Sequence, residues 1–262
     1  MAIATLLLAN AVLVALCFAV LWLIAIRIRD VSFVDSWWAL GMVVLAVASF
    51  LLTGPPAPRK VLLAALCAAW GLRLGIYLLW RWRRNGPDRR YQTMAGKAQS
   101  ERGVSFARWS LTAVFALQGP LQFVVALPVQ LGQLGGSTIG PLGLAGAGLA
   151  VIGILFESIG DAQLVRFKAD PANRGRVLDR GLWRFTRHPN YFGDACVWLG
   201  LFLIAAQSPI GLWSLPGPIL LTFLLTRWSG MPTIEGRLRR KKPDYEDYIR
   251  RTPAFVPWWP KA

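Results

Sequence analysis

Long, nearly uninterrupted runs of apolar residues constrain this chain more than any other feature. They recur along all 262 residues, of which 55% are hydrophobic. About 18 or more apolar residues suffice to cross a bilayer as a helix, which satisfies its backbone polar groups internally. We therefore predict an all-α, polytopic membrane protein with a single integral membrane domain over residues 1–262. The seven expected membrane helices cover residues 2–26, 32–52, 61–80, 109–131, 142–165, 191–206 and 211–227, and a cytoplasmic tail covers 228–262.

Basic residues gather in three segments of the chain. Most of the 29 Lys and Arg residues lie within 81–108, 166–187 and 227–261. Because cytoplasmic loops are enriched in Lys and Arg, we predict that these segments face the cytoplasm, with the N-terminus outside and the C-terminus inside. Arg59 and Lys60 then fall outside, as an exception. In a bacterium the protein would reside in the inner membrane. The net charge of +16 comes without the signature of a nucleic-acid reader, so no nucleic-acid partner is expected.

Cysteine, histidine and glycine patterns exclude several common site types. Cys17, Cys67 and Cys196 lie within apolar runs without paired spacing, and the chain has one histidine. Neither a disulfide framework nor a metal site is therefore predicted. The glycines around Gly143 and Gly146 lie in an apolar run and indicate close helix packing rather than a nucleotide loop. A dinucleotide, if one binds, is expected among helices.

Ionisable residues inside the expected helices are candidates for a functional site, because charge in hydrocarbon is costly and usually marks function. Asp35 lies near the start of the second helix and Arg73 lies inside the third. Glu157 and Asp161 share one face of the fifth helix, and Asp194 lies in the first turn of the sixth. Pairing of Arg73 with Asp35 or Glu157 would be a purely structural explanation. Together with the basic segments, the set predicts a polar cavity that opens to the cytosol and holds a phosphate-bearing ligand.

The stretch Arg184–Asp194 combines the only histidine with arginine, amide, phenol and carboxylate groups. Pro189 prevents a helix from running through it and biases His188 toward an extended conformation. A helix is expected directly afterwards, so these polar groups lie at the edge of the bilayer. A basic loop that only orients the protein is the alternative explanation. Further on, the tail interleaves tyrosines with charges and ends in an apolar segment at 254–258, so we expect it to fold back onto the membrane domain.

Three motifs resemble the steroid 5α-reductase family, in particular its short bacterial members. They are Arg187-His188-Pro189-Asn190-Tyr191-Phe192-Gly193-Asp194, Asp244-Tyr245-x-x-Tyr248 and Phe255-Val256-Pro257-Trp258. The resemblance covers residues 157–258 and is thinner before them. Family members are seven-helix membrane enzymes that use NADPH to reduce the carbon–carbon double bond of a 3-oxo-Δ4 steroid. The resemblance implies reduction of such a steroid, or of a related hydrophobic enone, to the 5α product, with substrate entering from the bilayer and NADPH from the cytosol.

The resemblance also implies site residues. Asp35 stands where the family has a catalytic glutamate that binds the 3-oxo group, whereas Trp70 replaces the partner tyrosine, so Tyr77 or Tyr91 would assist. Trp38 and Trp70 are expected beside the substrate, together with Asp35. The residues expected around NADPH are Arg73, Glu157, Asp161, Lys168, Arg176, Arg187, His188, Asn190, Tyr191, Asp194, Glu235, Arg239, Tyr245 and Tyr248.

Two other functions are compatible with parts of this pattern. Membrane methyltransferases of the isoprenylcysteine carboxyl methyltransferase type share an Arg-His-Pro-x-Tyr-x-Gly-like element and use S-adenosylmethionine. Asn190 with Asp194, the position of Asp35 and the surplus of basic residues favour the reductase. A transporter or lipid-binding protein would also explain intramembrane charges, but the sequence contains neither an inverted repeat nor a pair of broken helices. The physiological substrate and the oligomeric state are not predicted.

Overall fold

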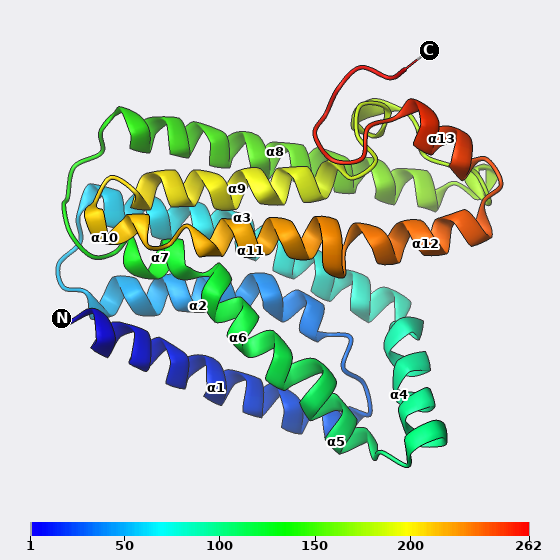
Figure 1. Cartoon of the computed structure of the whole chain (residues 1–262), viewed down its shortest axis with the longest axis horizontal. Helices are drawn as coiled ribbons and strands as arrows, with labels where there is room; N and C mark the ends of the chain where they lie inside the picture. Colours follow the sequence, from blue (N-terminus) through cyan, green and yellow to red (C-terminus); the bar gives the residue numbers. More distant parts are fainter. Residues whose placement is uncertain (1, 262) are drawn as a thin grey trace.

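Helices form the regular structure of the protein in the computed structural model, which describes residues 2–261 and contains no strand among them. Long helices lie side by side, and the chain runs back and forth between the two ends of the bundle (Figure 1). The N-terminus lies at one end and the C-terminus at the other. The short-loop end comprises residues 53–57, 132–140 and 206–208. The long-loop end comprises residues 86–105, 170–188 and 242–261.

Five helical segments are long and apolar enough to cross a membrane. They are α1 (Ile3–Ile28), α2 (Val34–Leu52), α3 (Pro58–Asn85), α8 (Pro141–Ala169) and the segment Pro209–Lys241, which holds α10 (Pro209–Leu212), α11 (Pro216–Phe223) and α12 (Met231–Lys241). This set is consistent with a multi-pass membrane protein. The all-helical fold predicted from the sequence is confirmed for the described residues.

The other two expected spans are shorter or interrupted. The expected helix at 109–131 is divided into α5 (Phe106–Ser110), a π-helical turn (Leu111–Phe115), α6 (Ala116–Val125) and α7 (Leu127–Leu131). Prolines at 120 and 128 remove backbone donors within this stretch, which explains the irregularity. α9 (Pro189–Ala205) has 17 residues and begins two residues before the expected start at residue 191. The structure thus supports five of the seven expected spans.

Two segments expected to be loop or tail contain helices. The end of α3 and α4 (Arg89–Arg102) occupy most of the expected polar loop at 81–108. Asp88 caps α4 by accepting the backbone N–H of Arg90 at 2.8 Å. The tail contains α12 and α13 (Tyr245–Arg251). Because these helices are rich in charge, they lack the apolar runs from which the other helices were predicted.

Glycines lie in the contact between α8 and α9, which is the most extensive helix–helix contact of the bundle. A Cβ on Gly153 would lie 2.5 Å from the carbonyl oxygen of Gly193, so a larger residue would push the helices apart. One and two turns further along α8 lie Glu157 and Asp161, next to the first turns of α9. Asn190, in the first turn of α9, accordingly reaches the Asp161 carboxylate. The glycine seam positions the polar groups described below.

Arg59 and Lys60 are buried at the short-loop end. The Arg59 guanidinium donates to the carbonyl oxygen of Gly135. The Lys60 ammonium donates to the carbonyl oxygens of Gly54 and Pro55 at 2.9 and 3.0 Å. Backbone carbonyls of the turns after α2 and α7 thus bind both charges. These contacts explain why basic residues occur at the end where the sequence predicts few.

Candidate functional site

An acid–phenol pair lies where α2 meets α4 at the long-loop end. The Tyr91 hydroxyl donates to Asp35 Oδ1 at 3.0 Å, and Arg90 Nη2 lies 3.5 Å from Asp35 Oδ2. Burial, followed by the negative charge of Asp35, raises the pKa of the Tyr91 phenol above its usual value. Tyr91 therefore retains its proton at neutral pH. Of the two tyrosines expected to assist Asp35, the structure brings Tyr91 to it.

Hydrogen bonds attach the start of α4 to the start of α2. The backbone N–H of Asp88 donates to Ser32 Oγ at 2.8 Å, and the Ser32 hydroxyl donates to the Asp30 carboxylate. Asp30 also accepts from Trp82 Nε1, near the end of α3, at 2.7 Å. The position of Tyr91 is thus set by contacts among three helices rather than by its own loop.

Gln118 on α6 extends the acid–phenol pair and was not identified from the sequence. Trp38 Nε1 donates to Gln118 Oε1 at 2.7 Å, and the Gln118 side chain lies close enough to the Tyr91 phenol to act on it. Trp38, expected beside the substrate, therefore lies next to the pair through this amide. An amide inside the apolar run at 109–131 was the signal available in the sequence.

A second polar cluster lies between α3, α8 and α9. Arg73 pairs with Glu157 at 3.1 Å and with Asp161 at 2.6 Å. Trp70 Nε1 donates to Glu157 Oε2 at 2.9 Å, and Asn190 Nδ2 donates to Asp161 Oδ1 at 3.4 Å. Both carboxyl groups are buried and share the single Arg73 guanidinium. Four residues expected around the cofactor are thus in mutual contact.

Trp70 and Tyr77, the two α3 residues that were expected near Asp35, lie apart from the acid–phenol pair. Trp70 is buried edge-to-face against Trp198, with ring centres 5.3 Å apart, and belongs to the Arg73 cluster rather than to the surroundings of Asp35. Tyr77 stacks with Trp80 at 6.3 Å. Tyr77 and Trp80 line a groove of about 300 Å³ between α3 and α8, which Arg73 and Asp161 also border.

Tyr191 and Asp194, in the first turns of α9, connect the two clusters. The charges of Asp35 and Arg90 in one cluster, and of Asp194 in the other, all act on the Tyr191 phenol. Asp194 is 9% exposed, and its Oδ1 has no hydrogen-bond partner among the described residues. Because buried polar atoms are nearly always paired, this oxygen is available to a donor on a ligand.

A cation cluster, which we define as Arg81, Lys168, Arg237 and Lys242, lies at the long-loop end. The charges of the other three act on Lys168, and none of the four forms an ion pair within residues 2–261. Lys242 also donates to the carbonyl oxygen of Arg176. Uncompensated positive charge contributed by three helices and the loop before α13 is suited to a phosphate-bearing ligand.

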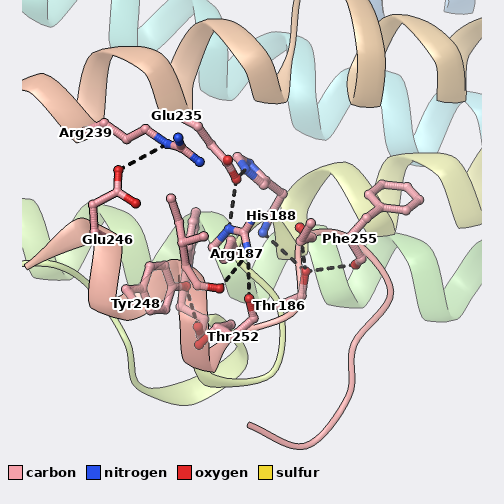
Figure 2. A network of polar contacts seen from close by, with 12 residues as sticks. Thr186, Arg187, His188, Glu235, Arg239, Glu246, Tyr248, Thr252 and Phe255 are labelled. Atoms are coloured by element: carbon pink, nitrogen blue, oxygen red, sulfur yellow. Dashed lines mark hydrogen bonds and ion pairs between the residues drawn. The ribbon is translucent and has the colours of Figure 1, made fainter. Parts of the chain in front are cut away.

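Figure 2 shows a third network, which joins the start of α9 to α12 and α13. Arg187 Nε and His188 Nε2 lie 2.9 and 3.0 Å from the same oxygen of Glu235. Arg187 Nη1 donates to the carbonyl oxygen of Thr252 at 2.6 Å. The Tyr248 hydroxyl donates to a backbone carbonyl at 2.5 Å. Several residues expected around the cofactor thus contact one another and the tail.

Backbone hydrogen bonds confirm that the tail folds back. The N–H of Arg187 donates to the carbonyl oxygen of Pro253, and the N–H of Trp258 donates to that of Phe185, both at 2.9 Å. Tyr245 is buried against Tyr248 in the third network, with ring centres 5.8 Å apart. The remaining expected cofactor residue of this region lies on the surface. It is Arg239, which faces Glu246 at 3.5 Å.

Comparison with known proteins identifies a family but no named relative. No group of His, Cys, Asp or Glu side chains suited to a metal ion occurs within the described residues. No curated protein and no solved structure matches the chain. One family model, described as a protein of unknown function (DUF1295), matches residues 21–252. The chain therefore belongs to the DUF1295 family, which is related to steroid 5α-reductase-like membrane proteins.

Proposed function

We propose that this protein is a membrane reductase that uses NADPH to reduce the carbon–carbon double bond of a 3-oxo-Δ4 steroid or a related hydrophobic enone. The observation that carries the proposal is the hydrogen bond from Tyr91 to Asp35. An enone is reduced only when its carbonyl oxygen is polarised, and a preorganised acidic proton beside that oxygen is the group that does this. Seven spans, with the long-loop end in the cytosol, are part of the proposal.

The residues at the long-loop end fit NADPH by charge and by chemistry. The cation cluster, with Arg176 beside Lys242, would hold the phosphates through charge-assisted hydrogen bonds. Asn190 and the unpartnered Asp194 oxygen would bind the polar groups of the nicotinamide half. When bound, NADPH supplies a hydride to the β-carbon of the enone.

Asp35 and Tyr91 act on the substrate oxygen in this mechanism. In its protonated form Asp35 accepts from the Tyr91 hydroxyl at Oδ1 and donates its own carboxylic proton to the substrate's carbonyl oxygen, which stabilises the negative charge that develops there. Gln118, which accepts a hydrogen bond from Trp38, holds the Tyr91 phenol in place. A proton from water, added to the α-carbon, completes the reaction, so the product gains one hydride and one proton. Substrate reaches the pair from the lipid side of α2 and α6.

The test is a reaction with the purified full-length protein in detergent. Testosterone or progesterone is added with NADPH, and the loss of reduced cofactor and the mass of the product are measured. We expect a product two hydrogens heavier that requires NADPH. Binding of S-adenosylmethionine without any binding of NADPH would overturn the proposal in favour of the methyltransferase.

A further inference from the structure

A hollow of about 620 Å³ lies at the long-loop end, outside the candidate site. The loop at 179–184, the end of α13 and the last residues of the tail line it. Arg251 Nη2 lies 3.8 Å from the Asp179 carboxylate across the hollow. The other basic side chains there belong to Arg180, Arg184 and Lys261.

Those three basic residues have no acidic partner among the described residues. All three are exposed, and none forms an ion pair within residues 2–261. Because the one carboxylate of the hollow already faces Arg251, the lining retains a net positive charge. An anion of headgroup size matches both the charge and the volume.

Apolar side chains are displayed beside the hollow on an ordered segment. Val256, Trp258 and Trp259 are 62, 71 and 70% exposed. They are nevertheless held firmly, because Thr186 Oγ1 donates to the Phe255 carbonyl at 2.8 Å and the Trp259 ring packs on Phe185 at 5.4 Å. Exposed tryptophans on a fixed backbone lose little conformational entropy when they enter a bilayer interface, where tryptophan is enriched.

Successive contacts between aromatic rings place the tail segment 255–259 beside the membrane-spanning part of the protein. Phe255 packs edge-to-face on Phe192 at 5.9 Å, and Phe192 packs on Phe156 of the candidate span α8 at 5.3 Å. Leu155 and Ile159, next to Phe156 on α8, expose their apolar side chains. In Figure 1 the tail turns back from α13 toward α8 and α9. The tail therefore lies where the lipid-facing surface of α8 approaches the long-loop end.

We propose that the hollow binds the headgroup of an anionic phospholipid while Val256, Trp258 and Trp259 enter the adjoining leaflet. Arg180, Arg184 and Lys261 contact the headgroup phosphate by charge-assisted hydrogen bonds. The two tryptophans hold the lipid-facing side of the segment at the interface. This inference is independent of the reductase proposal, because none of these residues belongs to the candidate site.

Native mass spectrometry of the full-length protein tests the headgroup site. The protein is placed in nanodiscs of phosphatidylglycerol or phosphatidylcholine. It is then released from the nanodisc in the spectrometer, and the lipid molecules that remain bound to it are counted. We expect one phosphatidylglycerol to remain bound to the wild type. Arg180→Gln, Arg184→Gln and Lys261→Gln together should weaken its retention by about fivefold for each charge removed. The matched control, Arg174→Gln with Arg240→Gln and Lys241→Gln, removes three exposed basic residues outside the hollow and should retain the lipid. Equal retention in all three proteins would overturn the proposal.

A second measurement uses the wild-type fold and separates lipid from other anions. Brominated phospholipids quench tryptophans that enter the bilayer, and Trp258→Phe with Trp259→Phe should remove part of this quenching. Trp213→Phe, at an exposed site near the short-loop end, controls for loss of a surface tryptophan. Inorganic phosphate should not displace the retained phosphatidylglycerol at equal concentration. Quenching that is unchanged in the Trp258/Trp259 variant, or full displacement by phosphate, would contradict a lipid site.

Discussion

The two ends of the helix bundle use basic side chains in opposite ways. At the short-loop end, Arg59 is 2% exposed, and it and Lys60 donate to backbone carbonyl oxygens of the neighbouring turns. At the long-loop end, the charges of the cation cluster act on one another, and although Asp161 also acts on Lys168, none of the four forms an ion pair within residues 2–261. A cation of the first kind stabilises the fold, whereas cations of the second kind oppose it until an anion binds. The comparison separates structural charge from charge available to a ligand.

The largest expected effect lies at the long-loop end and concerns activity alone. Asp35→Asn should lower turnover by about 100- to 10,000-fold, because the pair loses its acidic proton. Tyr91→Phe should lower turnover by a factor in the same range. The double variant should turn over little more slowly than either single variant, since the two groups act as a unit. Single-turnover rates and NADPH affinity are measured together. Normal turnover in Asp35→Asn would remove this residue from the mechanism.

The next effect lies at the short-loop end and concerns stability alone. Arg59→Met should cost about 2 kcal/mol, because it removes the charge-assisted hydrogen bonds that the buried guanidinium donates to backbone carbonyl oxygens. Thermal unfolding in detergent measures the loss, and Arg59→Lys, which keeps a donor, should recover part of it. NADPH affinity of the folded variant should equal that of the wild type. A weaker affinity at unchanged stability would show that Arg59 serves a ligand.

A paired change in the cation cluster should show the reverse pattern. Arg237→Gln with Lys242→Gln should weaken NADPH binding by about tenfold, as expected for lost charge-assisted hydrogen bonds to phosphate. Thermal stability without cofactor should stay the same or rise, since mutual repulsion decreases. Titration with NADPH and NADH measures the effect. The charge-matched control is Arg174→Gln with Arg240→Gln, which should bind like the wild type.

The smallest effect concerns the cap that positions Tyr91. Burial alone would raise the pKa of Asp88, but hydrogen bonds from Arg90 hold it below its usual value. A pKa lower in the folded than in the unfolded chain adds stability above about pH 4, and this contribution disappears as the pH falls through the folded value. Asp88→Ala should therefore cost about 1 kcal/mol at neutral pH and less in acid.

Unfolding of Asp88→Ala and the wild type is compared across this pH range, with Asp88→Asn as the variant that keeps a neutral cap. The gap between wild type and Asp88→Ala should narrow in acid. A gap that stays constant with pH would mean that the ionised carboxylate contributes nothing to the cap.

Local sequence predicted features that depend on neighbouring residues. Apolar runs identified the five long spans, because burial in a membrane requires apolar side chains over a full helix length. Pro189 indicated that no helix runs through this stretch and that one follows it, and α9 begins at Pro189 itself, since proline fits the first turn of a helix and not its interior. The spacing of Glu157 and Asp161 placed both on one helix face, and the structure pairs both with Arg73. The apolar end of the tail indicated that it folds back.

Contacts between distant segments were decided only by the tertiary structure. Tyr91, rather than Tyr77, reaches Asp35 because hydrogen bonds at residues 30–32 hold α4 against α2. Gln118 joins them because the irregular α5–α6 segment turns its amide toward Trp38. Sequence alone thus determined that the chain forms apolar helices with polar groups near their ends. How those helices rotate and approach, through the glycine contact of α8 with α9, determined which polar groups meet, because pairing depends on three-dimensional distance and not on separation along the chain.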